Sequence, residues 1–467
     1  MPAATDPLKA LYQSLNGRGA LPLDPDDAYY VPILEATPKK DPILHLWQRL
    51  DFAVSESVHL LTGFRGNGKS TELRRLKALL EQDANNRVFL VDMAEHLNTA
   101  KPLELSDFLL SLMAALGQQV EEDTGLKAIT HGYMERLQRF LTSEVELTGV
   151  DLDLSGAGGP KKLGFRLKTE PDFKARMQEH LRGHVSRLVS DARDYVLKLI
   201  GALRQRSDAP DALKVVLLVD SVEQVRGDGP DAAAVHESVR NLFSGQAASL
   251  AFPQLHVVYT VPPYLPVLSP NLGRTLAGHP IVSWPNVHVR DRAGIEDPAG
   301  LGIMEQIIER RFAGWRDIVP APMLRRLAVC AGGDLRDFFR LVGESVIALR
   351  TARFSEPDAV LDADMVRRVE EQLRNELLPI AEDDARWLAQ IHRTKDAALP
   401  TTGELPALAR FLDSNLIMNY LNGEPWYDIH PLLVEEIRPY LRALDQTRTD
   451  SGGHVDTRAE ARTGGAD

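Results

Sequence analysis

The feature that most limits how this chain can fold lies between Gly63 and Ser70. These eight residues, Gly-Phe-Arg-Gly-Asn-Gly-Lys-Ser, match the pattern G-x-x-x-x-G-K-[ST]. An apolar run, SVHLLT, precedes them, and a helix-forming stretch, TELRRLKALLEQ, follows. Glycines let the backbone curl so that its amide groups point at phosphate oxygens, and the positive end of the following helix favours the same negative charge. The motif and its flanks therefore predict a phosphate-binding loop between a strand and a helix.

Within this loop, Lys69 would neutralise the β- and γ-phosphates of a nucleotide, and the Ser70 hydroxyl would bind Mg²⁺. The alternative is a chance glycine-rich turn, since the chain contains 33 glycines. The sequence has no Asn-Lys-x-Asp pattern that would read guanine, which favours an adenine nucleotide. The other loop residues expected to contact the nucleotide are Gly63, Arg65, Gly66, Asn67, Gly68 and Thr71.

A second group of candidate residues follows two further apolar runs. The run KVVLLVD ends in Asp220, and the carboxyl end of such a buried strand is where an open α/β sheet places a nucleotide site. Asp220 would hold Mg²⁺ through water, and Glu223 is the candidate general base for the attacking water. Strand-end acids can instead cap the next turn. Thr260 ends the run LHVVYT and would touch the γ-phosphate or the water, although threonine is also common in strands.

The alternation of apolar runs with helical patterns predicts an α/β fold, a parallel sheet with helices on both faces. The distance between Lys69 and Asp220 implies an insertion at about 120–210. We expect helices there and a β-hairpin, because Leu163, Phe165 and Leu167 alternate with polar residues near a Gly-rich turn. The predicted parts are a flexible segment 1–27, an ATPase domain 28–295, a helical lid 296–380, a winged helix 381–443 and a disordered tail 444–467.

Charge and composition exclude several classes of protein. The net charge of −12 is the wrong sign for coating nucleic acid non-specifically. The winged helix, over 381–440, carries five basic and ten acidic residues, so we expect it to make intramolecular contacts or to bind protein rather than DNA. The single cysteine cannot form an internal disulfide. No apolar run is long enough to span a membrane and no export signal is evident, which favours the cytoplasm.

These features together resemble the ATPase core shared by AAA+ proteins and STAND proteins, the latter including the NACHT and NB-ARC switches. The resemblance covers about 28–442 without the insertion, and the spacing Asp220-Ser-Val-Glu223 is more similar to the NACHT form. It implies a switch that binds Mg-ATP and hydrolyses it slowly or with a partner's stimulation, in a bacterial defence or signalling complex. The alternatives are an AAA+ or ORC-like oligomeric ATPase that remodels protein or DNA, and a scaffold that binds ATP without hydrolysis.

Two further segments carry the resemblance. The stretch Gly332-Gly333-Asp-Leu-Arg336 resembles the start of an AAA+ lid helix, whose arginine senses the γ-phosphate; a solvated surface arginine is the alternative. The stretch containing His430 resembles the STAND winged-helix segment, whose histidine contacts the β-phosphate of ADP. His430 would otherwise cap the last helix. Leu335 stands where the STAND lid motif has proline, and Pro431 stands where aspartate is usual.

The resemblance also suggests where the base and a partner subunit would lie. Relatives bind adenine at the position of Tyr29, Tyr30, Val31 and Pro32, which could instead be core anchors. If the protein forms a homo-oligomer or binds a partner protein in trans, an arginine after the Thr260 strand could act as an arginine finger. The candidates are Arg274, Arg290 and Arg292, and an ordinary surface arginine is the favoured interpretation of each.

Overall fold

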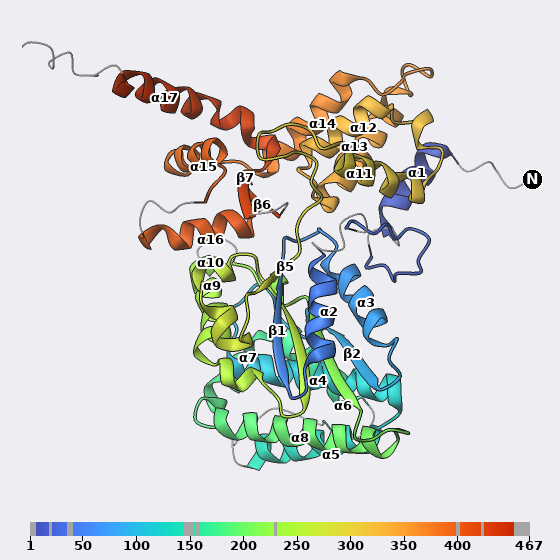
Figure 1. The fold of residues 1–467 in the computed structure, drawn as a ribbon, viewed down its shortest axis with the longest axis vertical. Helices are drawn as coiled ribbons and strands as arrows, with labels where there is room; N and C mark the ends of the chain where they lie inside the picture. The colour runs from blue at the N-terminus through green and yellow to red at the C-terminus, as the bar shows by residue number, and fades with distance from the viewer. Residues whose placement is uncertain are drawn as a thin grey trace, which may run out of the picture.

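The computed structural model describes residues 6–17, 21–34, 41–143, 154, 158–227, 231–397, 402–421 and 425–452. Figure 1 shows a domain built on a β-sheet, with two groups of helices beyond one end of the sheet. One group contains α11 to α14, and the other contains α15 to α17 with a small hairpin. None of the described helices is both long and apolar enough to cross a membrane.

The sheet has five parallel strands in the order β2-β3-β4-β1-β5. Because all strands run the same way, their carboxyl ends share one edge of the sheet, and the register places Asp92 directly beside Asp220. The strands are β1 Ser57–Thr62, β2 Asn86–Asp92, β3 Lys214–Asp220, β4 Leu255–Val261 and β5 Val282–Ser283.

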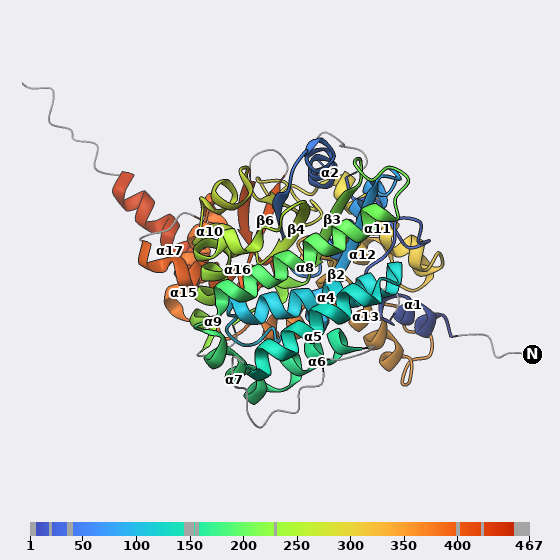
Figure 2. The same ribbon diagram turned by 90° about the horizontal axis from the view of Figure 1, so that it is seen from below.

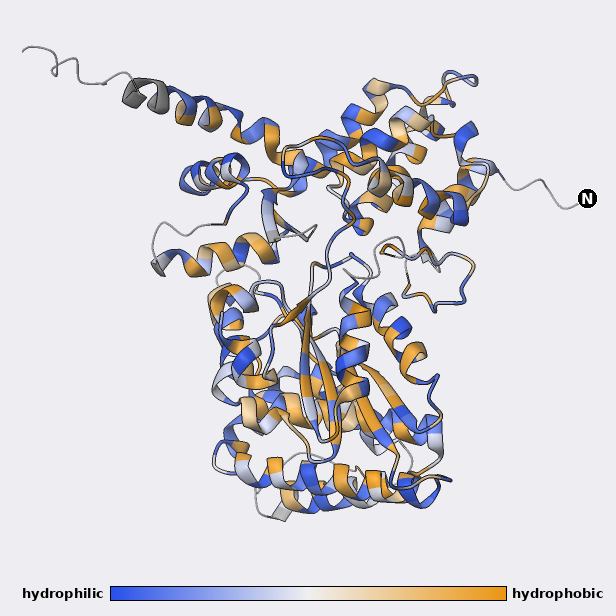
Figure 3. Cartoon of the chain, in the orientation of Figure 1, coloured by the Kyte–Doolittle hydropathy of each residue, from blue (hydrophilic) through white to orange (hydrophobic). Residues whose placement is uncertain are grey.

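Helices cover both faces of this sheet, which confirms the predicted α/β class. Leu61, Val216 and Val258 point to the face packed against α2 (Pro42–Phe52) and α3 (Lys69–Leu80). Their neighbours along the strands point to the other face, where α4 (Leu105–Thr124) packs. Figure 3 shows the strands as almost continuously hydrophobic, as expected of a sheet buried on both sides.

The insertion between β2 and β3 is helical where the structure describes it, and it lies on the side of the sheet opposite α2 (Figure 2). The predicted hairpin is wrong for its second strand, since Leu163, Phe165 and Leu167 lie in a helix, α6. Leu163 and Leu167 are one helical turn apart and buried, whereas Phe165 is 62% exposed. Three alternating residues fit a helix as well as a strand. The helices are α5 Lys127–Ser143, α6 Gly159–Thr169, α7 Pro171–Leu181 and α8 Val185–Gln205. The first strand of the hairpin is expected where Val145, Leu147, Val150, Leu152 and Leu154 partly alternate with polar residues, and all of these except Leu154 lie outside the described residues.

The helical lid includes a segment from the amino-terminal end of the chain. Helix α1 (Pro7–Leu15) begins at an Asp6 cap and packs against α13. Leu8, Leu11 and Leu15 are buried in the lid core, so the prediction of a flexible segment is wrong for this helix. Apolar residues spaced by three and four are typical of a helix, although the surrounding turn formers obscure the pattern. The lid helices are α11 Pro298–Arg311, α12 Ala321–Cys330, α13 Leu335–Ala352 and α14 Ala363–Glu376.

The carboxy-terminal group has the helix-helix-hairpin order predicted as a winged helix. Helices α15 (Glu382–Thr394) and α16 (Leu405–Asp413) precede the antiparallel strands β6 (Ile417–Leu421) and β7 (Pro425–Ile429). Helix α17 (Val434–Gly452) runs past residue 443, the expected boundary. The group contacts the sheet domain through His236 of α9, whose Nε2 lies 3.0 Å from Asp413 Oδ2.

The remaining elements connect these parts. They are α9 Ala232–Arg240, α10 Leu265–Leu268, η3 Met93–Glu95, η4 Val222–Gln224, η6 Asn241–Gly245, η7 Ala247–Leu250, η8 Gly273–Ala277, η9 Trp315–Asp317, η10 Thr402–Glu404 and η11 Pro431–Leu433.

Candidate functional site

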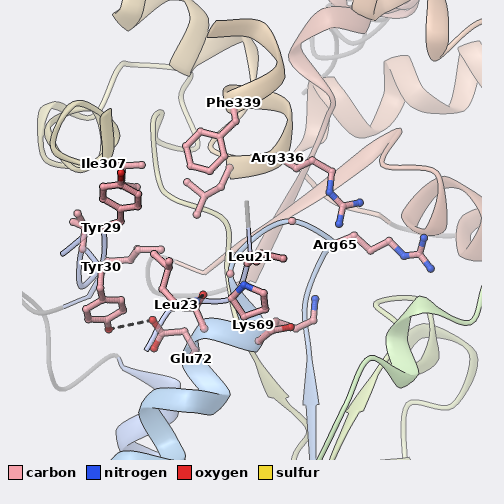
Figure 4. A pocket seen from close by; sticks show the side chains of 18 of the residues that line it. Leu21, Leu23, Tyr29, Tyr30, Arg65, Lys69, Glu72, Ile307, Arg336 and Phe339 are labelled. Atoms are coloured by element: carbon pink, nitrogen blue, oxygen red, sulfur yellow. Dashed lines mark hydrogen bonds between the residues drawn. The ribbon is translucent and has the colours of Figure 1, made fainter. Parts of the chain in front are cut away.

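A cavity of about 410 Å³ lies at the carboxyl edge of the sheet, between the phosphate-binding loop, the amino-terminal segment and the lid. Figure 4 shows Arg65, Lys69 and Arg336 at one end of it, and Tyr29, Tyr30 and Ile307 at the other. The predicted site residues that line the cavity are Tyr30, Val31, Arg65, Gly66, Gly68, Lys69, Ser70, Thr71, Glu223 and Arg336.

The loop has the backbone geometry that its glycines predict. Gly66 and Gly68 have φ angles of 82° and 89°, in the left-handed region that glycine adopts without strain. A Cβ on Gly66 would lie 2.5 Å from Arg336 Cβ, so the loop also needs glycine in order to approach the lid. Asn67, a predicted nucleotide contact, instead anchors the loop: its Nδ2 donates to the Trp284 carbonyl. Gly63 and Asn67 do not line the cavity.

Lys69 is buried at the base of the loop. Its Nζ donates to the carbonyl oxygens of Gly63 at 2.9 Å and Phe64 at 2.6 Å, and lies 3.6 Å from Glu223 Oε1. Burial lowers the pKa of Lys69, and the Glu223 carboxylate opposes that shift. The ammonium is thus held between the loop and the acid that follows β3.

Ser70 and Asp220, the predicted magnesium ligands, meet at this edge. The Ser70 hydroxyl lies beside the Asp220 carboxyl group and lowers its pKa. Burial and the neighbouring Glu223 charge outweigh this and raise the pKa of Asp220, because both disfavour the ionised carboxylate. Asp92, from the end of β2, adds a third negative charge nearby. No group of three or more acidic, histidine or cysteine side chains among the described residues is placed to hold a metal by itself, but a hydroxyl beside one carboxylate fits a hard cation such as Mg²⁺ whose other ligands are phosphate and water.

Glu223 has one carboxylate oxygen directed at Lys69, while the other, Oε2, has no hydrogen-bond partner among the residues that the structure describes. A short 3₁₀ turn positions Glu223, and Ser221 before it adopts a left-handed φ of 66°. The Val222 amide donates to Thr260 Oγ1 at 3.1 Å. Thr260 therefore holds this turn and does not itself line the cavity.

The lid reaches the cavity through the start of α13. Asp334 caps this helix, and its Oδ1 accepts from the Asp337 amide at 3.0 Å. Two residues into the helix, Arg336 lies against Gly66 at the phosphate end, where the sequence predicts a γ-phosphate sensor. The start of α13 therefore brings Arg336 to the loop. No ion pair with an acid fixes its side chain among the described residues, so the sensor role and the solvated surface role both stay predictions.

His430 does not line the cavity. Its side chain is fully buried, with Nε2 3.2 Å from Asp337 Oδ2, and Nδ1 accepts from the Leu432 amide at 3.2 Å. The histidine therefore caps the turn before α17 and joins it to the lid helix. The cap is on the turn that leads into the last helix and not on that helix itself, and the contact of His430 with the β-phosphate stays a prediction.

At the other end of the cavity, the segment before α2 crosses helix α3. The Leu23 amide donates to Thr71 Oγ1 at 3.1 Å, and Tyr30 donates from its hydroxyl to Glu72 at 3.3 Å. Burial raises the pKa of Glu72 to about 7, although its ion pair with Arg75 opposes the shift. The segment presents Tyr29, Tyr30 and Val31 to the cavity, whereas Pro32 does not line it.

Several lining residues were not identified from the sequence. Asp92 had a signal, because RVFLVD ends in a carboxylate as KVVLLVD does. Arg311 and Phe339 of the lid had none, since they look like ordinary members of amphipathic helices. Arg274, Arg290 and Arg292, the candidates for action in trans, do not line the cavity.

Neither a protein-family model nor a curated protein sequence matches this chain. Solved structures with a similar fold include the ORC2 protein of Aeropyrum pernix with ADPNP and ADP, at 11% identity and a TM-score of 0.41, covering 94% of this chain and 98% of that one. A Walker-type ATPase of Pyrococcus abyssi has 14% identity and a TM-score of 0.37, covering 88% and 100%. Cdc6p of Pyrobaculum aerophilum has 12% identity and a TM-score of 0.36, covering 92% and 98%. At these identities and TM-scores the likenesses carry no conclusion about function.

Proposed function

We propose that this protein binds Mg-ATP in the cavity and hydrolyses it. One observation carries the proposal: Lys69, Ser70 and Glu223 line the same end of a single cavity, and Asp220 lies directly behind them, beside Ser70 and Glu223. These groups come from two separate strand ends, and each has the chemistry that phosphoryl transfer needs.

In the proposed reaction, the triphosphate lies along the loop, and Lys69 exchanges its contact with Glu223 for phosphate oxygens. Ser70 and Asp220 would hold Mg²⁺, which neutralises charge on the phosphates when bound. Glu223 Oε2 accepts a proton from the attacking water, and Arg336 stabilises charge on the γ-phosphate. Thr260 keeps the Glu223 turn in place through the Val222 amide.

The shape of the cavity supports a nucleotide over a bare polyphosphate. Its far end is lined by aromatic and aliphatic side chains from the amino-terminal segment and the lid, which suits a purine base. The absence of the guanine-reading pattern from the sequence favours adenine.

For the wider role, we propose an AAA+ type ATPase whose lid and winged helix respond to the nucleotide. The position of His430 removes the direct argument for a STAND-type histidine lock, so this broader class fits better. A switch remains the second candidate, because α13 touches both the cavity and, through Asp337, the winged helix. We propose that a protein partner or a second copy of the chain binds differently according to the nucleotide in the cavity.

Two measurements test the proposal: calorimetric binding of ATP with and without Mg²⁺, and phosphate release by the purified protein. We expect binding that saturates at one ATP per chain and slow, magnesium-dependent release of phosphate. A protein that binds ATP but never converts it to ADP would support the scaffold alternative. A protein indifferent to ATP would refute the proposed function altogether.

A further inference from the structure

The end of the cavity away from Lys69, called the base end below, is lined by two segments that lie far apart in the sequence. Tyr29 comes from the segment before α2, while Ile307 and Phe339 come from lid helices α11 and α13. Figure 4 shows these three side chains facing the same space. Some interaction must hold the segment against the lid if this end of the cavity is to keep its shape.

Arg311, the last residue of α11, lies at this junction. Its Nη1 donates to the carbonyl oxygens of Ile307 at 3.1 Å and Tyr29 at 3.4 Å, the second across 282 positions of sequence. The guanidinium carbon is 4.5 Å from the centre of the Phe339 ring and 5.6 Å from that of Tyr29. One side chain thus contacts both lid helices and the amino-terminal segment, and it also lines the cavity.

The environment of Arg311 is unusual for an arginine. The residue is 9% exposed, and burial lowers its pKa to about 10, with Tyr29 and Asp27 opposing the shift. It remains charged at neutral pH. A buried cation is costly, and aromatic faces and carbonyl oxygens are the groups that stabilise a planar guanidinium. An apolar residue would fill this position at less cost if packing were its only purpose.

We propose that Arg311 is a positioning residue for the nucleoside part of the ligand. It fastens the Tyr29 segment to the lid and so builds the wall against which an adenine base packs. The proposal rests on the proposed function, since it assumes that the cavity takes a nucleotide. It adds that affinity for the base and affinity for the phosphates depend on different residues, Arg311 and Lys69 respectively.

The test compares two ligands, ATP and inorganic tripolyphosphate, by competition against a fluorescent adenine nucleotide. Arg311→Met keeps the length of the side chain but removes the charge and both hydrogen bonds. We expect a roughly tenfold loss of ATP affinity, as for one lost cation–aromatic and hydrogen-bonding group, with tripolyphosphate affinity unchanged. Arg311→Lys keeps the charge without the planar fork and should lie between wild type and Arg311→Met.

Arg310→Met is the matched control, because Arg310 is exposed on the same helix and outside the cavity. It should bind both ligands as wild type does. The rate of hydrogen exchange over residues 21–33 is a second measurement. Arg311→Met should increase this rate, and Lys69→Ala should leave it unchanged. If Arg311→Met fails to fold, Arg311→Lys provides the test: it should weaken ATP binding and leave tripolyphosphate binding unchanged. Equal loss of both ligands, or no loss of ATP affinity, would overturn the proposal while leaving ATP binding by the wild type intact.

Discussion

At the scale of single residues, the buried contact between Lys69 and Glu223 connects the binding and chemical parts of the site. Their 3.6 Å separation places Glu223, the proposed base, beside Lys69, the cation that would hold the phosphates. The unpartnered Oε2 of Glu223 is costly to bury, and such groups are concentrated where chemistry is performed. We therefore expect replacement of Lys69 to weaken nucleotide binding and replacement of Glu223 to slow hydrolysis.

Replacement of Glu223 by glutamine should stop turnover without preventing binding. Glutamine keeps the shape of the side chain but cannot accept the proton of the attacking water, so phosphate release should fall by roughly 100-fold or more. ATP affinity should stay within about threefold of wild type, because uniform binding is retained. Phosphate-release assays and calorimetry measure the two quantities.

The matched control is Glu81→Gln, at the exposed end of the neighbouring helix α3. It should leave both quantities unchanged. A Glu223→Gln protein with the wild-type rate of release would show that another group acts as the base.

Replacement of Lys69 by alanine should remove most of the affinity for nucleotide. A charge-assisted contact to phosphate is lost, and the expected cost is on the order of 2–3 kcal/mol, or about 30- to 150-fold in Kd. Lys77→Ala, on the same helix but outside the cavity, is the control. Equal calorimetric titrations for wild type and Lys69→Ala would show that the loop does not bind phosphate.

At the scale of secondary-structure elements, the first turn of α13 joins all three parts of the molecule. Arg336 faces the phosphate-binding loop, Asp337 contacts His430, and the Tyr420 hydroxyl donates to the Gly332 carbonyl at 2.8 Å. A displacement of this turn would therefore change contacts in both the cavity and the hairpin of β6 and β7.

Replacement of His430 by alanine should loosen the carboxy-terminal group from the lid. The variant loses the contact to Asp337 and the cap of η11, two buried interactions worth about 1–3 kcal/mol together. Hydrogen exchange should accelerate over β6, β7 and α17 and stay unchanged over β1, β3 and β4. His45→Ala, an exposed change on α2, should alter neither region, and equal protection of β6 and β7 in His430→Ala would contradict the coupling.

The elements also show how far sequence patterns suffice. The strands and the loop were predictable because buried parallel strands are long apolar runs and the glycine spacing is specific. Helices α1 and α6 were not. The apolar spacing of α1 is helical but is obscured by the turn formers around it, and the three alternating residues of α6 fit a strand as well as a helix. Leu163 and Leu167 become a buried face only because α4 lies beside them.

At the scale of the whole molecule, the phosphate end of the cavity follows from local sequence and the base end does not. Parallel strands bring Asp220 to the loop by topology, so a motif and a strand suffice to predict that pair. Arg311 meets Tyr29 only when the lid folds over the sheet domain, and no short pattern encodes that approach. Long-range packing therefore sets the end of the cavity that we propose takes the base.

The sheet domain also contains a chain of histidines near the start of β1 and β4, and this chain should make stability depend on pH. The Ser57 hydroxyl bridges His59 and His256 at 2.9 Å each, and His59 lies 2.7 Å from His279, which accepts from Arg49. Burial lowers the pKa of His59 to about 3, with His279, Arg49 and His256 adding to the shift.

Burial also lowers the pKa of His256 to about 4, with Lys214 adding to the shift and Glu56 opposing it. Histidine in the unfolded chain titrates near about 6.5, so between that value and the folded pKa the unfolded state binds more protons. The stability from neutral His59 and His256 is therefore complete above about pH 6.5 and is lost as the pH falls toward 4.

Replacing His59 by glutamine should make stability less sensitive to acid. Between pH 7 and pH 5, the wild type should lose on the order of 1–2 kcal/mol through His59 that the variant does not lose. The difference between the two proteins is the quantity to measure by urea unfolding at each pH. Buried Glu72, whose pKa is raised, contributes with the opposite sign in both proteins and cancels from that difference. The exposed His45→Gln should follow the wild-type curve. If the difference in unfolding free energy between wild type and His59→Gln were the same at pH 7 and pH 5, the pKa of His59 would have to be the same in the folded and unfolded chains, and the prediction would be wrong.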